Sequence, residues 1–168
     1  KVAEQSFTTK LDSWYSFTQE MNDKGISFEN YLVKAEFVMC NEKIASFFNV
    51  PFETEVLKVT RLRGDKSGPF VYFESYIHPR IGVSKEEDFE KPLYELLEKK
   101  YKTPVSISNE KIKARIASKI TAKNLKIKQG EPVLIRERFV SDPGNRPVEY
   151  NIGFYIAEKF TYSIEIRR

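Results

Sequence analysis

Two arginines, Arg61 and Arg63, stand two residues apart in a segment that alternates like a β-strand, and Glu74 lies in a second such segment. Alternate residues share one face of a strand, so the two guanidinium groups are expected side by side. A guanidinium group binds phosphate or carboxylate through two parallel hydrogen bonds. The spacing therefore favours an anion-binding face, with an ordinary surface ion network as the alternative.

The segment Val56–His78 predicts a hairpin in which Gly64 pairs with Pro69 across a polar turn. This register gathers two sets of alternating residues on one face: Leu57, Val59, Arg61 and Arg63 with Phe70, Tyr72, Glu74 and Tyr76. A carboxylate beside an arginine pair either neutralises it or accepts hydrogen bonds from a polyol. A shift of one residue would send every side chain to the opposite face.

Composition argues against several other kinds of site. The chain has 168 residues, one cysteine (Cys40) and one histidine (His78), which argues against an internal disulfide, a histidine-rich metal site and a catalytic triad. The net charge of +4 raises the question of nucleic acid, but the basic residues are scattered. We expect no cofactor and no metal, and no membrane-spanning segment or signal peptide.

The periodicity predicts helices and strands that alternate along the chain. Helices are expected over Ser13–Lys24, after the capping residue Asn41, and from about Lys91 to Tyr101. Strands are expected over Asn30–Cys40, Val105–Ala117 with a bulge near Asn109, and Phe160–Ile166. Several aromatic residues are assigned to the core: Trp14, Phe47, Phe48 and Phe73.

A weak internal repeat relates two parts of the chain. Lys43–Arg61 resembles Ile120–Arg138, and the alignment matches Arg61 with Arg138. Each copy predicts a helix and a strand, followed after a polar turn by a second strand. Two such units predict one pseudo-symmetric sheet, and hence a single α+β domain with a mainly antiparallel sheet flanked by helices.

An ordered set of short motifs runs through the chain: R-x-R at Arg61, F-E-S-Y at Phe73, L-Y-x-L-L at Leu93, G-E-P-V-L at Gly130 and V-E-Y at Val148. Together they resemble the UTRA effector-binding domain of GntR-family transcriptional regulators of the HutC subfamily. The resemblance implies a chorismate-lyase-like fold over residues 1–168, an effector-binding and dimerisation role, and no catalysis. It also implies an N-terminal winged-helix DNA-binding domain that these residues do not include, which agrees with a start at Lys1 rather than at a methionine.

The resemblance also implies site residues. The anion would be held by the start of the first helix, at Phe17, Thr18 and Gln19, and by the arginine pair Arg61 and Arg63. Hydroxyl or amide groups of the effector would be bound by four further residues: Glu74, Tyr94, Glu149 and Tyr155. Two positions depart from the family pattern, because Gln19 stands where arginine is frequent and Pro92 replaces a serine. They leave room for a less charged or differently shaped effector.

The leading hypothesis is therefore the sensing domain of a bacterial transcriptional repressor. It would be cytoplasmic and homodimeric, and would touch DNA only through the winged helix. The effector would be a sugar phosphate or another anionic metabolite, such as a carboxylate. Two alternatives remain: a chorismate-lyase-type enzyme using Glu74 or Glu149 as acid or base, and a dimerisation module without a ligand.

Overall fold

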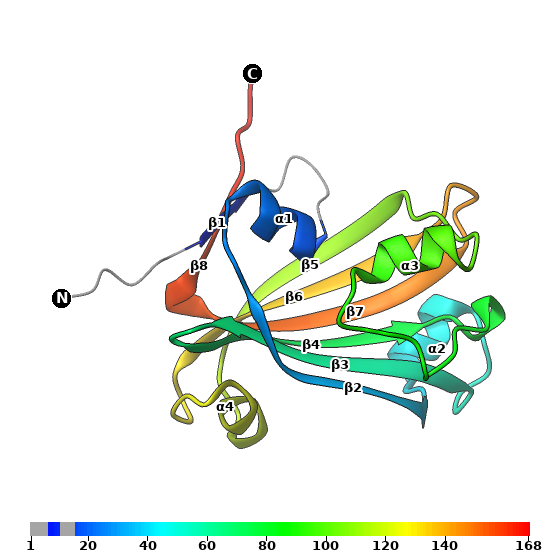
Figure 1. The fold of residues 1–168 in the computed structure, drawn as a ribbon, viewed down its shortest axis with the longest axis horizontal. Helices are drawn as coiled ribbons and strands as arrows, with labels where there is room; N and C mark the ends of the chain where they lie inside the picture. The colour runs from blue at the N-terminus through cyan, green and yellow to red at the C-terminus, as the bar shows by residue number, and fades with distance from the viewer. Residues whose placement is uncertain (1–6, 11–15) are drawn as a thin grey trace.

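The computed structural model describes residues 7–10 and 16–168 (Figure 1). Its strands are β1 (Phe7–Lys10), β2 (Glu29–Met39), β3 (Glu55–Asp65), β4 (Gly68–Ile77), β5 (Ile107–Ile116), β6 (Pro132–Ser141), β7 (Pro147–Ile156) and β8 (Phe160–Ser163). Its helices are α1 (Phe17–Asp23), α2 (Glu42–Phe48), α3 (Leu93–Lys99) and α4 (Lys119–Leu125), with short 3-10 turns η1 (Pro79–Ile81) and η2 (Ala157–Lys159).

Six strands form one antiparallel sheet in the order β2-β3-β4-β7-β6-β5. The order is that of two three-stranded halves joined at β4 and β7, so the pseudo-symmetric sheet predicted from the repeat is confirmed. The predicted α+β class is confirmed as well. β1 and β8 form a separate parallel pair, and the predicted last strand ends at Ser163 rather than at Ile166.

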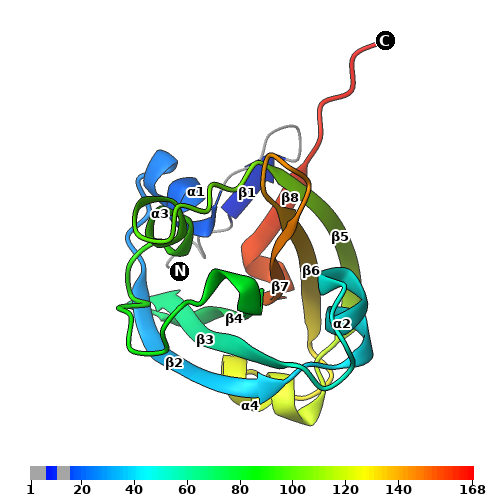
Figure 2. The same ribbon diagram turned by 90° about the vertical axis from the view of Figure 1, so that its right-hand side faces the viewer.

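The helices cover both faces of this curved sheet (Figure 2). On the outer, convex face, α2 packs its buried side chains on β7, and α4 packs on the neighbouring end of the sheet. On the inner, concave face, α1 contributes Phe17 and Met21 to one buried cluster, and α3 contributes Leu93 and Leu97 to another. Helices therefore bury side chains on both faces of the sheet.

The helix starts follow local capping chemistry. Asn41 caps α2 by accepting a hydrogen bond from the Ile44 backbone N–H, as predicted. Ser16 caps α1, so this helix begins at Phe17, later than predicted from the periodicity. Residues 13–15, including the predicted core residue Trp14, lie outside the described residues. Helix α3 begins at Leu93, directly after Pro92.

The β3–β4 hairpin contains a bulge that the predicted register lacked. Gly64 pairs with Pro69 as predicted, but Arg63 pairs with Val71, so Phe70 is an extra residue. A Cβ atom on Gly64 would collide with the Gly68 carbonyl, and only glycine allows this close approach. The predicted register beyond this point is therefore wrong by one residue.

The predicted bulge near Asn109 is also wrong. The pairing of β5 with β6 runs without a shift from Ile107 opposite Ser141 to Ile116 opposite Pro132. Strand β5 is an edge strand, and most of its side chains are exposed. Its irregular apolar pattern reflects this exposure rather than a break in the ladder.

Candidate functional site

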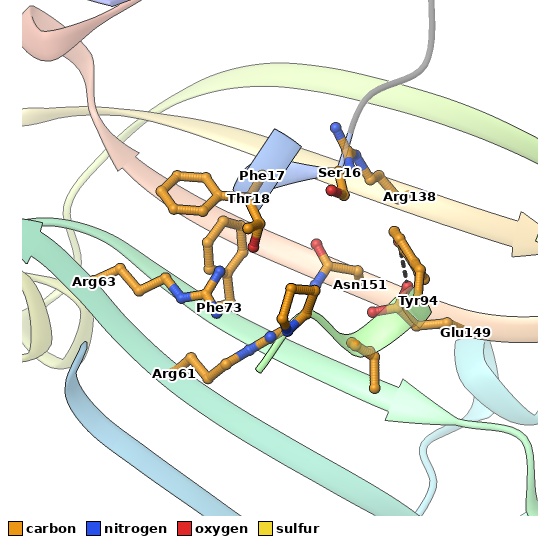
Figure 3. A pocket seen from close by; sticks show the side chains of 12 residues that line it. Ser16, Phe17, Thr18, Arg61, Arg63, Phe73, Tyr94, Arg138, Glu149 and Asn151 are labelled. Carbon is orange, nitrogen blue, oxygen red and sulfur yellow. Dashed lines mark hydrogen bonds between the residues drawn. The ribbon is translucent and has the colours of Figure 1, made fainter. Parts of the chain in front are cut away.

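A small cavity lies between the inner face of the sheet and the helices α1 and α3 (Figure 3). It has a volume of about 40 Å³, enough for about three water positions. Its walls come from six elements and the residues just before α1 and α3: Ser16, Phe17, Thr18, Arg61, Arg63, Phe73, Pro92, Leu93, Tyr94, Arg138, Glu149 and Asn151. Six of these twelve have charged or hydrogen-bonding side chains on the sheet or on α3.

The arginine pair faces this cavity, and among the described residues neither guanidinium forms an ion pair. Arg63 is 1% exposed, donates from Nε to the Asn30 side-chain oxygen at 2.9 Å, and lies between two aromatic rings. Its Cζ atom is 5.2 Å from the ring centre of Phe17 and 4.8 Å from that of Phe28. Arg61 makes one long hydrogen bond, 3.4 Å from Nη2 to the Ser75 hydroxyl.

The donor groups of both arginines are incompletely used. Arg61 Nε and Arg63 Nη2 are buried and have no hydrogen-bond partner among the described residues. Burial, together with the neighbouring charge of Arg61, lowers the pKa of Arg63 to about 8. Burial also lowers the pKa of Arg61, with the charge of Glu149 opposing it. Two adjacent buried cations with unused donors make a strong anion-binding surface.

The opposite wall of the cavity offers oxygen atoms. Glu149 is 1% exposed, and its Oε2 accepts a 2.6 Å hydrogen bond from the Tyr94 hydroxyl (Figure 3). Burial and the adjacent carboxylate raise the pKa of Tyr94 well above its usual value, which keeps the phenol protonated. Asn151 donates to the Ser75 hydroxyl at 2.8 Å. A ligand with an anionic end and a hydroxyl end would find complementary groups on the two walls.

The start of α1 closes the cavity, in partial agreement with the resemblance. The side chains of Phe17 and Thr18 belong to its walls. Gln19 is not part of the cavity wall. Its backbone N–H donates to the Ser16 hydroxyl at 3.2 Å, and the residue lines an outer groove. This groove of about 450 Å³ runs between α1 and α3, and it shares four wall residues with the cavity: Ser16, Thr18, Pro92 and Tyr94. The groove gives a larger molecule room next to the anion-binding wall.

Besides Gln19, two further predicted site residues lie outside the cavity walls. Glu74 faces the outer side of the sheet, where its Oε2 accepts a 2.6 Å hydrogen bond from Tyr76 and lies 3.2 Å from Lys58 Nζ. The cause is the bulge, which pairs Glu74 with Thr60 and turns it away from the arginines. Tyr155 is on the inner face but is 2% exposed and packs edge-on against Phe73, outside the cavity walls.

The structure adds residues that the motifs did not indicate. Arg138 brings a third guanidinium to the cavity, and Asn151 and Ser16 bring polar groups. A signal for Arg138 was present, because the internal repeat matches it with Arg61 in the other half of the sheet. Since the two halves are related by the sheet order, equivalent positions of β3 and β6 face the same cavity.

Other kinds of site find little support in the described part of the chain. No group of three or more histidine, cysteine, aspartate and glutamate side chains there could hold a metal ion. His78 is engaged in structure, with Nε2 3.0 Å from the Phe48 carbonyl and Nδ1 accepting from the Arg80 backbone N–H. Among the described helices, none has the length and apolar character needed to cross a membrane.

Comparison with known proteins agrees with this geometry. A family model described as the UTRA domain matches residues 23–161. The HTH-type transcriptional repressor NagR of Bacillus subtilis (strain 168) is 22% identical over 162 residues, which span 96% of this chain and 67% of that protein.

Solved structures show the same fold. The effector domain of PhnF from Mycobacterium smegmatis has a TM-score of 0.86 at 16% identity, covering 96% of this chain and 100% of that one. A GntR-family transcriptional regulator from Enterococcus faecalis V583 has a TM-score of 0.71 at 22% identity, covering 83% and 100%. These likenesses confirm the chorismate-lyase-like fold, and the family match spans most of the chain. The chain therefore belongs to the UTRA domain family of GntR-type transcriptional regulators.

Proposed function

We propose that this domain senses a small organic anion, with a sugar phosphate as the first candidate, and that the anionic group binds against Arg61 and Arg63. The single observation that carries the proposal is the pair of buried guanidinium groups with unused donors and no ion pair among the described residues. A buried charge without a partner is costly, and a bound anion would remove that cost. Glu149, Tyr94 and the outer groove would then receive the hydroxyl-bearing part.

In the full regulator, binding would change the DNA affinity of an N-terminal winged helix. NagR is described as an HTH-type transcriptional repressor, and this chain matches 67% of its length. We place the protein in the HutC subfamily and expect a cytoplasmic homodimer, whose two winged helices would meet two half-sites of an operator. For regulation, the effector must prefer one arrangement of the domains over the other.

A thermal-shift screen tests the anion site. The chain is heated with hexose phosphates, with the corresponding free hexoses and with small carboxylates, in parallel with Arg61→Ala and with the exposed-site control Arg115→Ala. We expect a phosphorylated sugar to raise the melting temperature of the parent and of the control, but not of Arg61→Ala, because only a ligand that binds the native state stabilises it. Equal stabilisation of all three proteins, or of none, would contradict the proposal.

Catalysis is not part of the proposed function. A chorismate-lyase-type activity would need Glu149 as acid or base, and its carboxylate is engaged by Tyr94. Incubation of the chain with chorismate is expected to give no product. A domain that serves only for dimerisation would bind no member of the ligand panel, and Arg61→Ala would then change stability alone.

A further inference from the structure

Arg138 belongs both to the cavity and to a buried ion network that reaches α1. The side chain is on β6, is 6% exposed and lines the cavity. Its Nη2 is 3.5 Å from Glu20 Oε1 on α1, and its Nε is 2.9 Å from Glu110 Oε1 on β5. Neither of these two nitrogens has the geometry of a hydrogen bond with any described residue. These two nitrogens are thus held by charge and not by directed hydrogen bonds.

Its neighbour Arg136 is held differently. Arg136 donates from Nε to Glu110 Oε2 at 2.7 Å and from Nη1 to Glu20 Oε1 at 3.3 Å. Glu20 therefore keeps a hydrogen-bonded partner on the sheet whatever Arg138 does. The two arginines and Glu20 are each at most 6% exposed, so their mutual attraction is weakly screened by solvent and salt.

We propose that Arg138 is a third contact for the effector anion, and that Glu20 of α1 competes with the anion for it. The inference rests on the proposed function and adds a route from the ligand to a helix. An anion held by Arg61 and Arg63 would present negative charge to Arg138, whose Nε and Nη2 make no hydrogen bond with a described residue. The attraction between Arg138 and Glu20 would weaken as the attraction to the ligand grew.

Helix α1 is the element that this exchange affects. It carries Glu20 into the ion network and Phe17 and Thr18 into the cavity wall, so ligand and network act on one seven-residue helix. Coupling of this kind is reciprocal: if the ligand weakens the contact between Glu20 and Arg138, the charge of Glu20 must weaken ligand binding equally. This reciprocity gives a test by binding alone.

The test uses inorganic phosphate as the probe, titrated by thermal shift at about 0.15 M NaCl in a phosphate-free buffer. Glu20→Gln is expected to lower the Kd for phosphate about fivefold, the lower range of such couplings. The matched control is Asp23→Asn, an exposed residue at the end of the same helix with the same change of charge, and it should alter Kd less than about twofold.

A double-mutant cycle assigns the effect to Arg138. Arg138→Met is expected to raise Kd roughly tenfold, the loss of one charge-assisted hydrogen bond. In the Arg138→Met background, adding Glu20→Gln should leave the Kd unchanged, because the side chain for which Glu20 and the anion compete is then absent. If Glu20→Gln fails to fold, Glu20→Asp replaces it, with the same direction expected because the shorter side chain withdraws the carboxylate from Arg138.

The outcomes separate this inference from the proposed function. Phosphate that stabilises the parent but not Arg61→Ala supports the anion site. If Glu20→Gln then changes the Kd for phosphate no more than Asp23→Asn does, or still lowers Kd when Arg138→Met is present, the competition is refuted while the anion site stands. A parent chain that binds no phosphate and no phosphorylated sugar refutes both. A lower Kd in Glu20→Gln that exceeds the change in Asp23→Asn and disappears with Arg138→Met supports both the competition and the anion site.

Discussion

Replacing Arg63 by methionine should stabilise the ligand-free domain. Burial of an unpaired charge costs several kcal/mol. The hydrogen bond to Asn30 offsets about 1.5–3 kcal/mol of this, and the contacts with the rings of Phe17 and Phe28 offset about 1 kcal/mol each. We expect the remaining penalty to be about 1–2 kcal/mol, the lower end of the ~1–4 kcal/mol gained when apolar side chains replace buried charged groups. A methionine of similar length keeps the packing and removes the charge, so Arg63→Met should raise the free energy of unfolding by about that amount.

The assay is urea and thermal unfolding, followed by circular dichroism in a buffer free of phosphate and sulfate. The melting temperature should rise by about 2–4 °C per kcal/mol for a domain of this size. The matched control is Arg115→Met on the exposed edge strand, which should stay within about 0.5 kcal/mol of the parent. A loss of more than about 1 kcal/mol in Arg63→Met would show that the buried guanidinium is a net stabiliser, and the reasoning would be wrong.

Arg63→Met should be more stable than the parent without ligand but should bind the anion less tightly. An anion at one hundred times its Kd stabilises the parent by about 2.7 kcal/mol. Arg63→Met lacks half of the arginine pair and should gain little. The order of stability of the two proteins should therefore reverse between ligand-free and ligand-saturated conditions, which a single titration by thermal shift can follow.

Three further predictions concern the scaffold. Burial lowers the pKa of His78 below its usual value near 6.5, so the unfolded chain binds the proton more tightly than the folded one. The free energy of unfolding should therefore fall as pH drops below about 6.5, which urea titrations at pH 7.5 and 5.5 test. His78→Gln should reduce this dependence of stability on pH. Although burial opposes ionisation, hydrogen bonds from Tyr150 and Lys43 lower the pKa of Glu137 to about 2. Its contribution to stability is therefore complete above about pH 4.5 and is lost towards pH 2. Glu137→Gln should be less stable than the parent at pH 7 but lose less stability on acidification, and an equal loss in both proteins would contradict this. Gly153→Ala should cost about 1–3 kcal/mol in urea unfolding, because the new Cβ would lie 2.9 Å from a ring atom of Phe73, and an unchanged midpoint would count against tight packing there.

The architecture was predictable where local chemistry and repetition agreed. The Asn41 cap follows from side-chain chemistry within one turn, and the pseudo-symmetry of the sheet follows from the repeat of a helix and two strands. The arginine pair was predictable as a shared face, because alternation over two residues needs no knowledge of the partner strand.

The remaining site residues depended on pairing across strands. A single extra residue at Phe70 decides that Glu74 faces outward, and this bulge lies next to the close backbone approach at Gly64, which the alternation pattern does not contain. Arg138 reaches the cavity because β6 and β3 occupy equivalent places in the two halves of the sheet. The alignment of the repeat contained this information, but the charge of Arg138 alone did not distinguish it from an exposed arginine.

The two edge strands of the sheet, β5 and β2, differ in the side chains that they expose to solvent. Strand β5 presents Lys111, Lys113 and Arg115 along an exposed edge, and an approaching copy of that strand would bring like charges into register. Strand β2 instead exposes Phe37 and Met39, which are 47% and 64% accessible. Electrostatic repulsion is therefore expected to oppose the addition of a further strand at the β5 edge, whereas the β2 edge carries charges of both signs and no such run of like charges.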